Sequence, residues 1–302
     1  MTLGPPSGEQ HTISNGNARA VVTQVGATLR HYSVDGYDVV DGFDDGRRAH
    51  DGRGQVLAPW PNRIAGGRYR YRDQECQAAL NEPSRQNAIH GLVRWLDWNP
   101  VAHDATSVSL ACSLRPQPGY EWQLGLVVRY ALGDGGLTVD LRAVNVDSRR
   151  APFGVGFHPY LAVGPGTADD AELLLPAASY LDPTGTLPVS GTPHDFTRRR
   201  RIGPTQLDTA YGSLQRGDDG RTRATLTAAD GRGVELWADA TFAWFMVYTG
   251  DQVGEPERRR RAVAVEPMTC PPEAFRTGID VVELDPGGSW TGTWGLRPIG
   301  LA

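Results

Sequence analysis

A histidine and a carboxylate stand out in this chain because each follows an apolar, strand-like run and directly precedes a proline. His158 lies in Phe-Gly-Val-Gly-Phe-His-Pro-Tyr-Leu (residues 153–161), and Glu266 lies in Val-Ala-Val-Glu-Pro-Met-Thr-Cys (residues 263–270). An imidazole and a carboxylate held at rigid strand ends suit paired general acid and base catalysis. Apolar neighbours favour a raised pKa for Glu266, which makes it a better base near neutral pH. The alternatives are a core histidine and a strand-end carboxylate that faces water.

The segment before the histidine contains two glycines, Gly154 and Gly156. Glycine in a strand permits close approach of a ligand or of another backbone. This spacing therefore favours a functional His158 over a core histidine. The segment is not a dinucleotide fingerprint, because Pro159 stands where a glycine would be required.

Further segments supply groups that bind hydroxyls. Asn62 and Arg63 follow Pro-Trp-Pro, and His90 precedes a glycine in a loop-like segment. The planar donor fork of arginine suits vicinal hydroxyls or carboxylates, while a loop ion pair is the alternative. Asp208, taken alone, is a turn residue. Together with the acid–base pair, these segments predict an enzyme that acts on a small polar molecule.

Metal and thiol chemistry are not favoured. The sequence contains no HExxH, EF-hand loop, Gly-x-Ser-x-Gly or Cys-x-x-Cys, and a site from His90, His158 and a carboxylate would lack the usual ligand spacing. Cys76, Cys112 and Cys270 are odd in number and widely spaced, which argues against disulfides. Cys270 could be a nucleophile, but a small apolar filler is favoured because buried structural thiols are common and unreactive.

The chain contains no lysine, so all 30 basic residues are arginine. Schiff-base catalysis needs a lysine amine and a P-loop needs its lysine, so both classes are excluded. The formal net charge of -5 argues against a nucleic-acid binder. The arginine runs 198–201 and 258–261 could grip phosphates, but their turn-forming and charged neighbours favour solvated loops.

The candidate residues must be positioned by β-strands. Strand patterns occur at 20–25, 107–114, 122–132, 137–144, 225–227, 234–237, 241–248, 281–284 and 289–294. Glycine-rich turns at 133–136, 230–233 and 285–288 predict a hairpin between the strands that flank each turn. No window keeps a helical period over three turns. The class is therefore all-β and antiparallel, closing as a sandwich or barrel.

Length and composition bound the organisation. No composition break marks a boundary, so residues 10–302 are predicted to form a single domain after a disordered start at residues 1–9. No apolar run reaches the length of a membrane span, and the N-terminus lacks the features of a signal peptide. The cytoplasm is the expected compartment. Oligomeric state is not determined by these features.

In its motifs the chain resembles the aldose 1-epimerase (galactose mutarotase) family from Ser14 to Pro298. The motifs, in order, are Asn-Arg at 62–63, Asn-x-x-His-Gly at 87–91, Gly-x-His-Pro-Tyr-Leu at 156–161, Asp-x-x-Tyr at 208–211 and Val-Glu-Pro-Met-Thr at 265–269. Each motif alone is weak, and their order makes the set specific. The resemblance implies a large antiparallel β-sandwich, sometimes called a supersandwich. Two departures are Tyr211, where the family commonly has Phe, and Met246, near where many members have Gln.

The resemblance also implies an isomerase that interconverts the α and β anomers of a free hexose or related aldose. Glu266 would be the general base that takes the anomeric hydroxyl proton, and His158 the general acid that protonates the ring oxygen. The implied substrate-binding residues are His90, Arg63, Asp208 and Asn62. The reaction needs no metal, no redox cofactor and no covalent intermediate. The predicted partner is a small-molecule sugar rather than a nucleic acid or a membrane.

Three alternatives stay open. A hexose-6-phosphate 1-epimerase would use the same acid and base with added arginine contacts to phosphate. A non-catalytic carbohydrate-binding protein of the same fold would not need an acid–base pair, so the presence of both groups argues against it. A glycosidase usually needs two carboxylates that flank the bond, and Glu273, near Glu266, lies in a proline-rich turn.

Overall fold

The computed structural model describes residues 4–301, and most elements in this range are strands. In β12 (Leu124–Gly133) every second residue is buried. This is the pattern of a strand that packs one face on a core and turns the other toward solvent. Neighbouring strands pair in antiparallel fashion, so the predicted all-β antiparallel class is confirmed.

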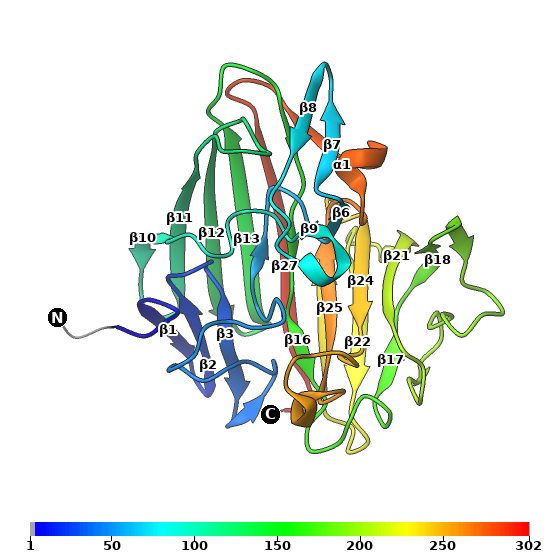
Figure 1. Cartoon of the computed structure of the whole chain (residues 1–302). Coiled ribbons are helices and arrows are strands. Elements are labelled where there is room, and N and C mark those ends of the chain that lie inside the picture. Colours follow the sequence, from blue (N-terminus) through cyan, green and yellow to red (C-terminus); the bar gives the residue numbers. More distant parts are fainter. Residues whose placement is uncertain (1–3, 302) are drawn as a thin grey trace.

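Two large sheets dominate the described chain (Figure 1). The first, within residues 4–301, has nine strands in the spatial order β10 (Asn99–His103), β11 (Ser107–Leu114), β12, β13 (Gly136–Asn145), β27 (Ser289–Ile299), β23 (Gly233–Ala238), β22 (Thr222–Thr227), β17 (Glu172–Leu174) and β20 (Arg200–Arg201). The second follows β19 (Gly185–Pro188), β18 (Ala177–Asp182), β21 (Asp208–Leu214), β24 (Trp244–Tyr248), β25 (Ala262–Met268), β15 (Gly156–Phe157) and β5 (Val56–Leu57), with β16 (Tyr160–Ala162) also paired to β25.

Smaller sheets and short helical turns complete the described chain. One sheet contains β1 (Gln10–Asn15), β2 (Ala18–Thr23), β3 (Leu29–Val34) and β4 (Tyr37–Asp38). Paired strands are β6 (Arg63–Ala65) with β9 (Asn87–Ile89), β7 (Arg68–Tyr71) with β8 (Gln74–Gln77), and β14 (Ala151–Phe153) with β26 (Val282–Leu284). The helical turns are η1 (Pro83–Arg85), η2 (Pro256–Arg258) and α1 (Ala274–Thr277).

The core lies between the two large sheets. Phe157 of β15 meets Trp294 of β27 with ring centroids 5.1 Å apart, and both side chains are buried. A continuous cluster of buried apolar side chains joins strands of both sheets and of β1–β3. Two packed antiparallel sheets make the large β-sandwich that the sequence predicts.

Two of the three predicted hairpins form, and the third is wrong. β12 pairs with β13 across the 133–136 turn, and β22 pairs with β23 across the 230–233 turn. The strands that flank 285–288 do not pair with each other. β26 pairs with β14, while β27 lies between β13 and β23. In that central place β27 is hydrogen-bonded along both edges, whereas a hairpin with the three-residue β26 would occupy only a short part of one edge.

The start of the described chain packs on the small sheet. Ser7 is buried, and its carbonyl accepts a hydrogen bond from the Val25 amide. The remainder of the predicted disordered start, residues 1–3, lies outside the described residues. Within residues 4–301, no helix is long and apolar enough to cross a membrane.

Candidate active site

All six residues predicted for the site line a single cavity of about 460 Å³. These residues are Asn62, Arg63, His90, His158, Asp208 and Glu266. They come from positions up to 204 residues apart, on β6, β15–β16, β21, β25 and the loop after β9. The cavity therefore gathers the motifs that the sequence presents separately.

Strand alternation aims Glu266 into the cavity. Along β25, Val263 and Val265 join the main core, whereas Ala264 and Met268 belong to separate apolar clusters on the opposite face. Glu266 shares that second face because side chains two residues apart point the same way. The residue lies inside the strand rather than at its end, since the pairing with β24 continues through Pro267 and Met268.

Glu266 and His158 form a buried pair. The Nε2 atom of His158 lies 3.4 Å from Oε1 of Glu266, with side chains 6% and 2% exposed. Burial raises the pKa of Glu266 well above its ordinary value, and the charge of Asp208 adds to the rise. Burial lowers the pKa of His158 to about 3. The predicted elevation of the Glu266 pKa therefore has the predicted cause, an apolar environment.

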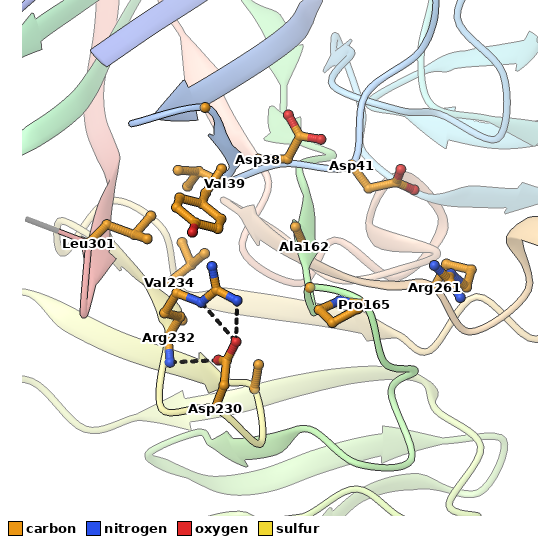
Figure 2. Close-up of a pocket in the computed structure, with 15 residues that line it drawn as sticks. Asp38, Val39, Asp41, Ala162, Pro165, Asp230, Arg232, Val234, Arg261 and Leu301 are labelled. Carbon is orange, nitrogen blue, oxygen red and sulfur yellow. Dashed lines mark hydrogen bonds and ion pairs between the residues drawn. The ribbon is translucent and has the colours of Figure 1, made fainter. Parts of the chain in front are cut away.

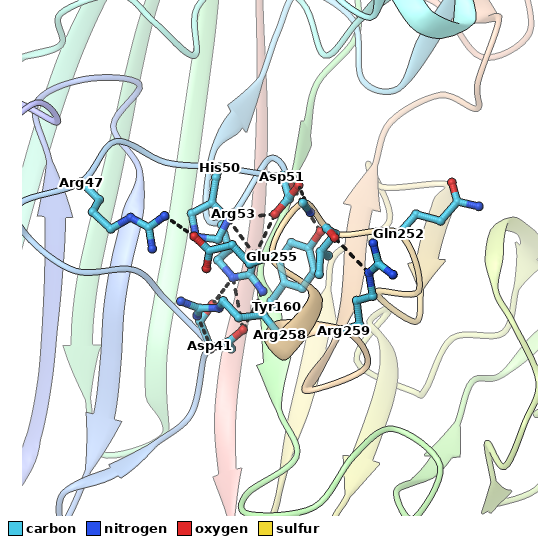
Figure 3. A network of polar contacts seen from close by, with 12 residues as sticks. Asp41, Arg47, His50, Asp51, Arg53, Tyr160, Gln252, Glu255, Arg258 and Arg259 are labelled. Atoms are coloured by element: carbon cyan, nitrogen blue, oxygen red, sulfur yellow. Dashed lines mark hydrogen bonds and ion pairs between the residues drawn. The ribbon is translucent and has the colours of Figure 1, made fainter.

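The imidazole of His158 is held in place from two sides. Tyr160 stacks on it with ring centroids 5.0 Å apart and planes 16° apart, and the Arg53 guanidinium lies 4.2 Å from the centre of the Tyr160 ring (Figure 3). Gly52 lies against it, because a Cβ atom there would approach Cδ2 of His158 to 2.5 Å. The φ angle of Gly52 is +75°, which also favours glycine. Both the close contact and the backbone conformation therefore require glycine at this position.

His90 and Asn62 fix each other's geometry. The backbone N–H of Asn62 donates a hydrogen bond to Nδ1 of His90 at 3.2 Å, and the backbone N–H of His90 donates to the backbone carbonyl of Asn62 at 2.8 Å. Both residues have a positive φ, 52° and 64°, an uncommon backbone conformation that marks functional turns. Burial lowers the pKa of His90 well below its ordinary value. A neutral ring with Nδ1 as acceptor carries its proton on Nε2.

Arg63 makes an ion pair and also lines the cavity. The two interpretations of this residue, a loop ion pair and a site residue, are therefore compatible. Its Nε donates to Glu82 at 3.0 Å and its Nη2 donates to the other oxygen of that carboxylate at 3.2 Å. Its Nη1 lies 3.5 Å from Asp208. Asp208 is the first residue of β21 rather than a turn residue, and it also lies 3.6 Å from Arg85. These charges form one rim of the cavity.

Other lining residues were not predicted from the sequence. Asp51, Glu82, Arg85, Arg94, Tyr248 and Gln252 line the cavity. Arg94 follows His90 by only four positions, and this closeness to the motif could have indicated that Arg94 belongs to the site. Gln252 comes from the loop after β24, and its Oε1 accepts a hydrogen bond from Arg85 at 2.6 Å. A glutamine thus reaches the cavity from this loop, while Met246, the residue named above as a departure from the family motif, is buried opposite Glu266 on β24.

The glycines before His158 and the thiol of Cys270 have packing roles. A Cβ atom on Gly154 would approach the Cys270 sulfur to 2.6 Å, and one on Gly156 would meet Pro61 and Met268 at 3.0 Å. These glycines leave space for neighbouring side chains of the protein rather than for a ligand, and neither of them lines the cavity. Cys270 is fully buried, and burial raises the pKa of its thiol to about 12. The filler interpretation of Cys270 agrees with this environment.

The two arginine runs lie outside this cavity. Arg258 donates to Asp41 at 2.5 Å, and Arg260 donates to Asp251 at 2.6 Å. Figure 3 shows how such contacts attach the 250–261 loop to the 41–53 loop. In the other run, Arg200 packs over the Phe196 ring at 3.9 Å. The expectation of solvated loops is wrong for Arg260, whose side chain is only 17% exposed.

A second cavity of about 540 Å³ lies elsewhere, between β4, β16 and the turn before β23 (Figure 2). Its described lining residues include no histidine, glutamate or cysteine. Its Asp230 is already paired with Arg232. Of these two cavities, the smaller one therefore contains the His158–Glu266 pair.

Comparisons with known proteins bear on the family and the fold of the chain. The family model described as aldose 1-epimerase matches residues 9–297. The uncharacterized protein YihR of Escherichia coli (strain K12) is 35% identical over 289 residues, which cover 93% of this chain and 90% of that protein. The GalM/aldose epimerase homologue of C. elegans shares the fold with a TM-score of 0.84 at 18% identity, covering 96% of this chain and 98% of that chain. Galactose 1-epimerase from Lactobacillus acidophilus NCFM has a TM-score of 0.77 at 21% identity, covering 95% and 93%.

Proposed function

This chain belongs to the aldose 1-epimerase family, and from that premise we propose that its cavity interconverts the α and β anomers of an aldose. The observation that carries the proposal is the contact of 3.4 Å between His158 Nε2 and Glu266 Oε1 inside the cavity. Mutarotation removes a proton from the anomeric hydroxyl and adds one to the ring oxygen. Two groups held this close can serve those neighbouring oxygens of one sugar.

The proton count of the pair matches the reaction. In the ring-opening step Glu266 takes the proton of the anomeric hydroxyl, while protonated His158 gives a proton to the ring oxygen and the bond from that oxygen to the anomeric carbon breaks. The pair starts and ends with one proton, and no oxidant or other reactant is consumed. Closure on the other face of the rotated aldehyde reverses both transfers. The raised pKa of the carboxyl and the lowered pKa of the imidazole place the single proton of the pair on Glu266, so this proton passes to His158 across the 3.4 Å contact before the ring opens.

The remaining predicted residues receive binding roles in this proposal. His90 offers the Nε2–H donor to the ring oxygen, with its ring 5.3 Å from that of His158. Arg63 and Asp208 hold hydroxyl groups at the charged rim, and Asn62 orients His90 through the two hydrogen bonds that join them. The cytoplasm stays the predicted compartment, and the single domain at residues 10–302 stays the predicted organisation.

The first test is polarimetry on the purified protein with freshly dissolved α-glucose and α-galactose. We expect faster mutarotation than the buffer gives, and we expect Glu266→Gln to lower kcat by about 100- to 10,000-fold, the usual contribution of a general base. Glu75→Gln, which changes an exposed carboxylate side chain, is the matched control and should behave as wild type. Near-wild-type activity of Glu266→Gln would remove Glu266 from this role.

The phosphate-specific alternative loses the support that the arginine runs offered, since residues 198–201 and 258–261 do not line the cavity. The non-catalytic alternative has no observation in its favour, because both members of the acid–base pair are present and in contact. A glycosidase is not supported by Glu273, whose carboxylate accepts hydrogen bonds from the Ala65 amide at 3.0 and 3.1 Å instead of lining the cavity.

A further inference from the structure

Arg85 and Gln252 join two distant segments at the cavity. Arg85 belongs to η1 and Gln252 to the loop after β24, and the two residues are 167 positions apart. Nη2 of Arg85 donates a hydrogen bond to Oε1 of Gln252 at 2.6 Å, and both residues line the cavity. Nη1 of the same guanidinium lies 3.6 Å from Asp208. The contact between Arg85 and Gln252 is called the clasp below.

The clasp lies at the exposed end of the cavity, and the acid–base pair lies at its buried end. The side chains of His158 and Glu266 are 6% and 2% exposed. Those of Arg85 and Asp208 are 42% and 41% exposed, and Gln252 is exposed as well. A ligand whose reacting atoms touch the pair therefore extends from the buried end toward the clasp.

The segment that carries Gln252 is attached firmly to the rest of the protein. The backbone N–H of Gln252 donates a hydrogen bond to the Tyr248 hydroxyl at 2.7 Å, and the backbone N–H of Gly254 donates to Asp51 at 3.2 Å. Val253, between them, is 1% exposed and packs in an apolar cluster. These contacts fix the backbone of the loop on one side of the clasp.

The segment that carries Arg85 is attached in the same way. Glu82, which precedes η1, accepts hydrogen bonds from Arg63 at 3.0 and 3.2 Å and from the Asn87 side chain at 2.7 Å. The backbone N–H of Arg85 donates to the Glu82 carbonyl at 3.1 Å, and Pro83 restrains the backbone at the start of the turn. Because both segments are anchored, the opening between them has a fixed width, which the two clasp side chains bridge.

The proposed function places a sugar ring relative to the clasp. Its anomeric carbon, C1, lies between His158 and Glu266 at the buried end of the cavity. In a pyranose the ring carbon opposite C1 is C4, so C4 and its oxygen point toward the exposed end. A free hydroxyl on C4 adds no atoms beyond that oxygen. A second sugar on the same oxygen would need the space that Arg85 and Gln252 occupy.

We propose that the clasp makes the cavity selective for monosaccharides over aldoses that carry a further sugar on the C4 oxygen. This specificity rests on the proposed function, because the direction of C4 follows from the roles of His158 and Glu266. A longer substrate must break the hydrogen bond between Arg85 and Gln252 before its C1 reaches the pair. The bond has a charged donor, so its loss should weaken binding of the longer substrate by about tenfold.

The experiment compares kcat/KM for β-glucose with kcat/KM for β-maltose, which is glucose with a second glucose on its C4 oxygen. We expect β-glucose to exceed β-maltose by about tenfold or more in the wild type, measured by polarimetry. Gln252→Ala should bring this ratio close to one, through a higher kcat/KM for β-maltose. Gln252→Glu keeps an acceptor for the Arg85 guanidinium and should therefore keep the ratio.

Two further variants separate the clasp from other effects. Gln215→Ala is the matched control, because it changes an exposed glutamine that does not line the cavity, and it should keep the wild-type ratio. Arg85→Met opens the clasp from its other side and should also lower the ratio, while KM rises for both sugars because Asp208 loses a nearby cation. An unchanged ratio in both Gln252→Ala and Arg85→Met would overturn the inference.

The two proposals fail in different ways. Turnover of β-glucose and β-maltose with equal kcat/KM in the wild type, dependent on Glu266, would keep the mutarotase function and overturn the role of the clasp. Calorimetric binding of β-maltose that is tighter in Gln252→Ala than in the wild type, without turnover of either sugar, would keep the clasp and overturn the catalytic function.

Discussion

At the scale of single residues, the loss of solvating water shifts the pKa values of Glu266 and His158 in opposite directions. Burial raises the pKa of Glu266 and lowers the pKa of His158 because each group loses solvation of its charged form. Asp208 and Arg63 act on Glu266 in opposite senses. Arg53 and Arg94 lower the pKa of His158, while Asp51 raises it. Desolvation is the largest cause for both groups, so the protonation of the pair depends on the apolar walls more than on any single neighbour.

This arrangement predicts a flat pH profile. The pair keeps one proton between the lowered pKa of His158 and the raised pKa of Glu266, so acid inactivation begins only as pH falls toward the lowered value. We expect kcat/KM for the enzymatic component, after subtraction of the buffer rate, not to fall as the pH is lowered from 7 to about 5. A solvated histidine would instead give an inflection near its ordinary pKa of about 6.5. Such an inflection in the wild type would contradict the buried-pair description.

Arg63 has a different kind of role, because its guanidinium is already held by Glu82 and Asp208. Replacing it with alanine leaves two carboxylates of the rim without that cation. We expect Arg63→Ala to raise KM by about tenfold, the effect of losing one charge-assisted hydrogen bond of about 1.5 kcal/mol, with a smaller change in kcat. Initial-rate polarimetry over a range of sugar concentrations measures both constants. An unchanged KM would contradict the binding assignment.

At the scale of elements, the loop before β5 supports the imidazole of His158. Gly52 allows this loop to pass directly against the imidazole of His158. Tyr160, the first residue of β16, donates its hydroxyl to the Asp51 carbonyl at 2.9 Å and so joins the same loop to the strand beside Glu266. The position of His158 thus depends on the loop as well as on the proline after it.

Gly52→Ala tests this dependence. The added Cβ would displace the His158 ring, so we expect kcat to fall by at least tenfold. Gly16→Ala is the matched control, since Gly16 also has a positive φ, +56°, and a Cβ atom there would have no atom within 4 Å apart from those of its own residue and its two chain neighbours. Both variants should lose about 1 kcal/mol of stability from left-handed backbone strain. Equal activity of the two variants, measured by polarimetry, would show that the contact with His158 is unimportant.

At the scale of the whole molecule, a residue of the sandwich core, Phe157, directly precedes the cavity residue His158 in the sequence. Phe157 packs on Trp294 and Phe242 from the core side, while His158, the next residue, faces the cavity. Packing between the sheets therefore determines where the imidazole lies. The same packing joins both sheets in one apolar cluster.

We therefore expect the described chain to unfold as one cooperative unit. Phe157→Ala should cost about 3–5 kcal/mol, the usual effect of removing a buried aromatic ring, and should shift the whole transition. Val127→Ala, at a position 39% exposed on β12, should change stability little. Calorimetry and tryptophan fluorescence in a denaturant series measure the transition. Two separate transitions for the two sheets would contradict a shared core.

The sequence by itself determined the class of the fold and the residues of the candidate site. Alternation along β11, β12 and β13 and the turn at 133–136 are local features, so their strands and hairpin could be predicted from neighbouring residues. His158 and Glu266 could be selected as candidates because proline and apolar neighbours mark them in the chain. Local patterns failed at 285–288, where a hairpin-like turn joins strands that find other partners.

Only the tertiary structure decided which side chains meet and which charged groups are buried. His158 and Glu266 are 108 positions apart, and their contact depends on the pairing of β15 and β16 with β25. The need for glycine at position 52 arises from a side chain that is distant in sequence. Arg94 resembles any other arginine in the chain until folding buries it in the wall of the cavity. Burial and long-range pairing belong to the folded chain as a whole, which is why residue types and spacing did not reveal them.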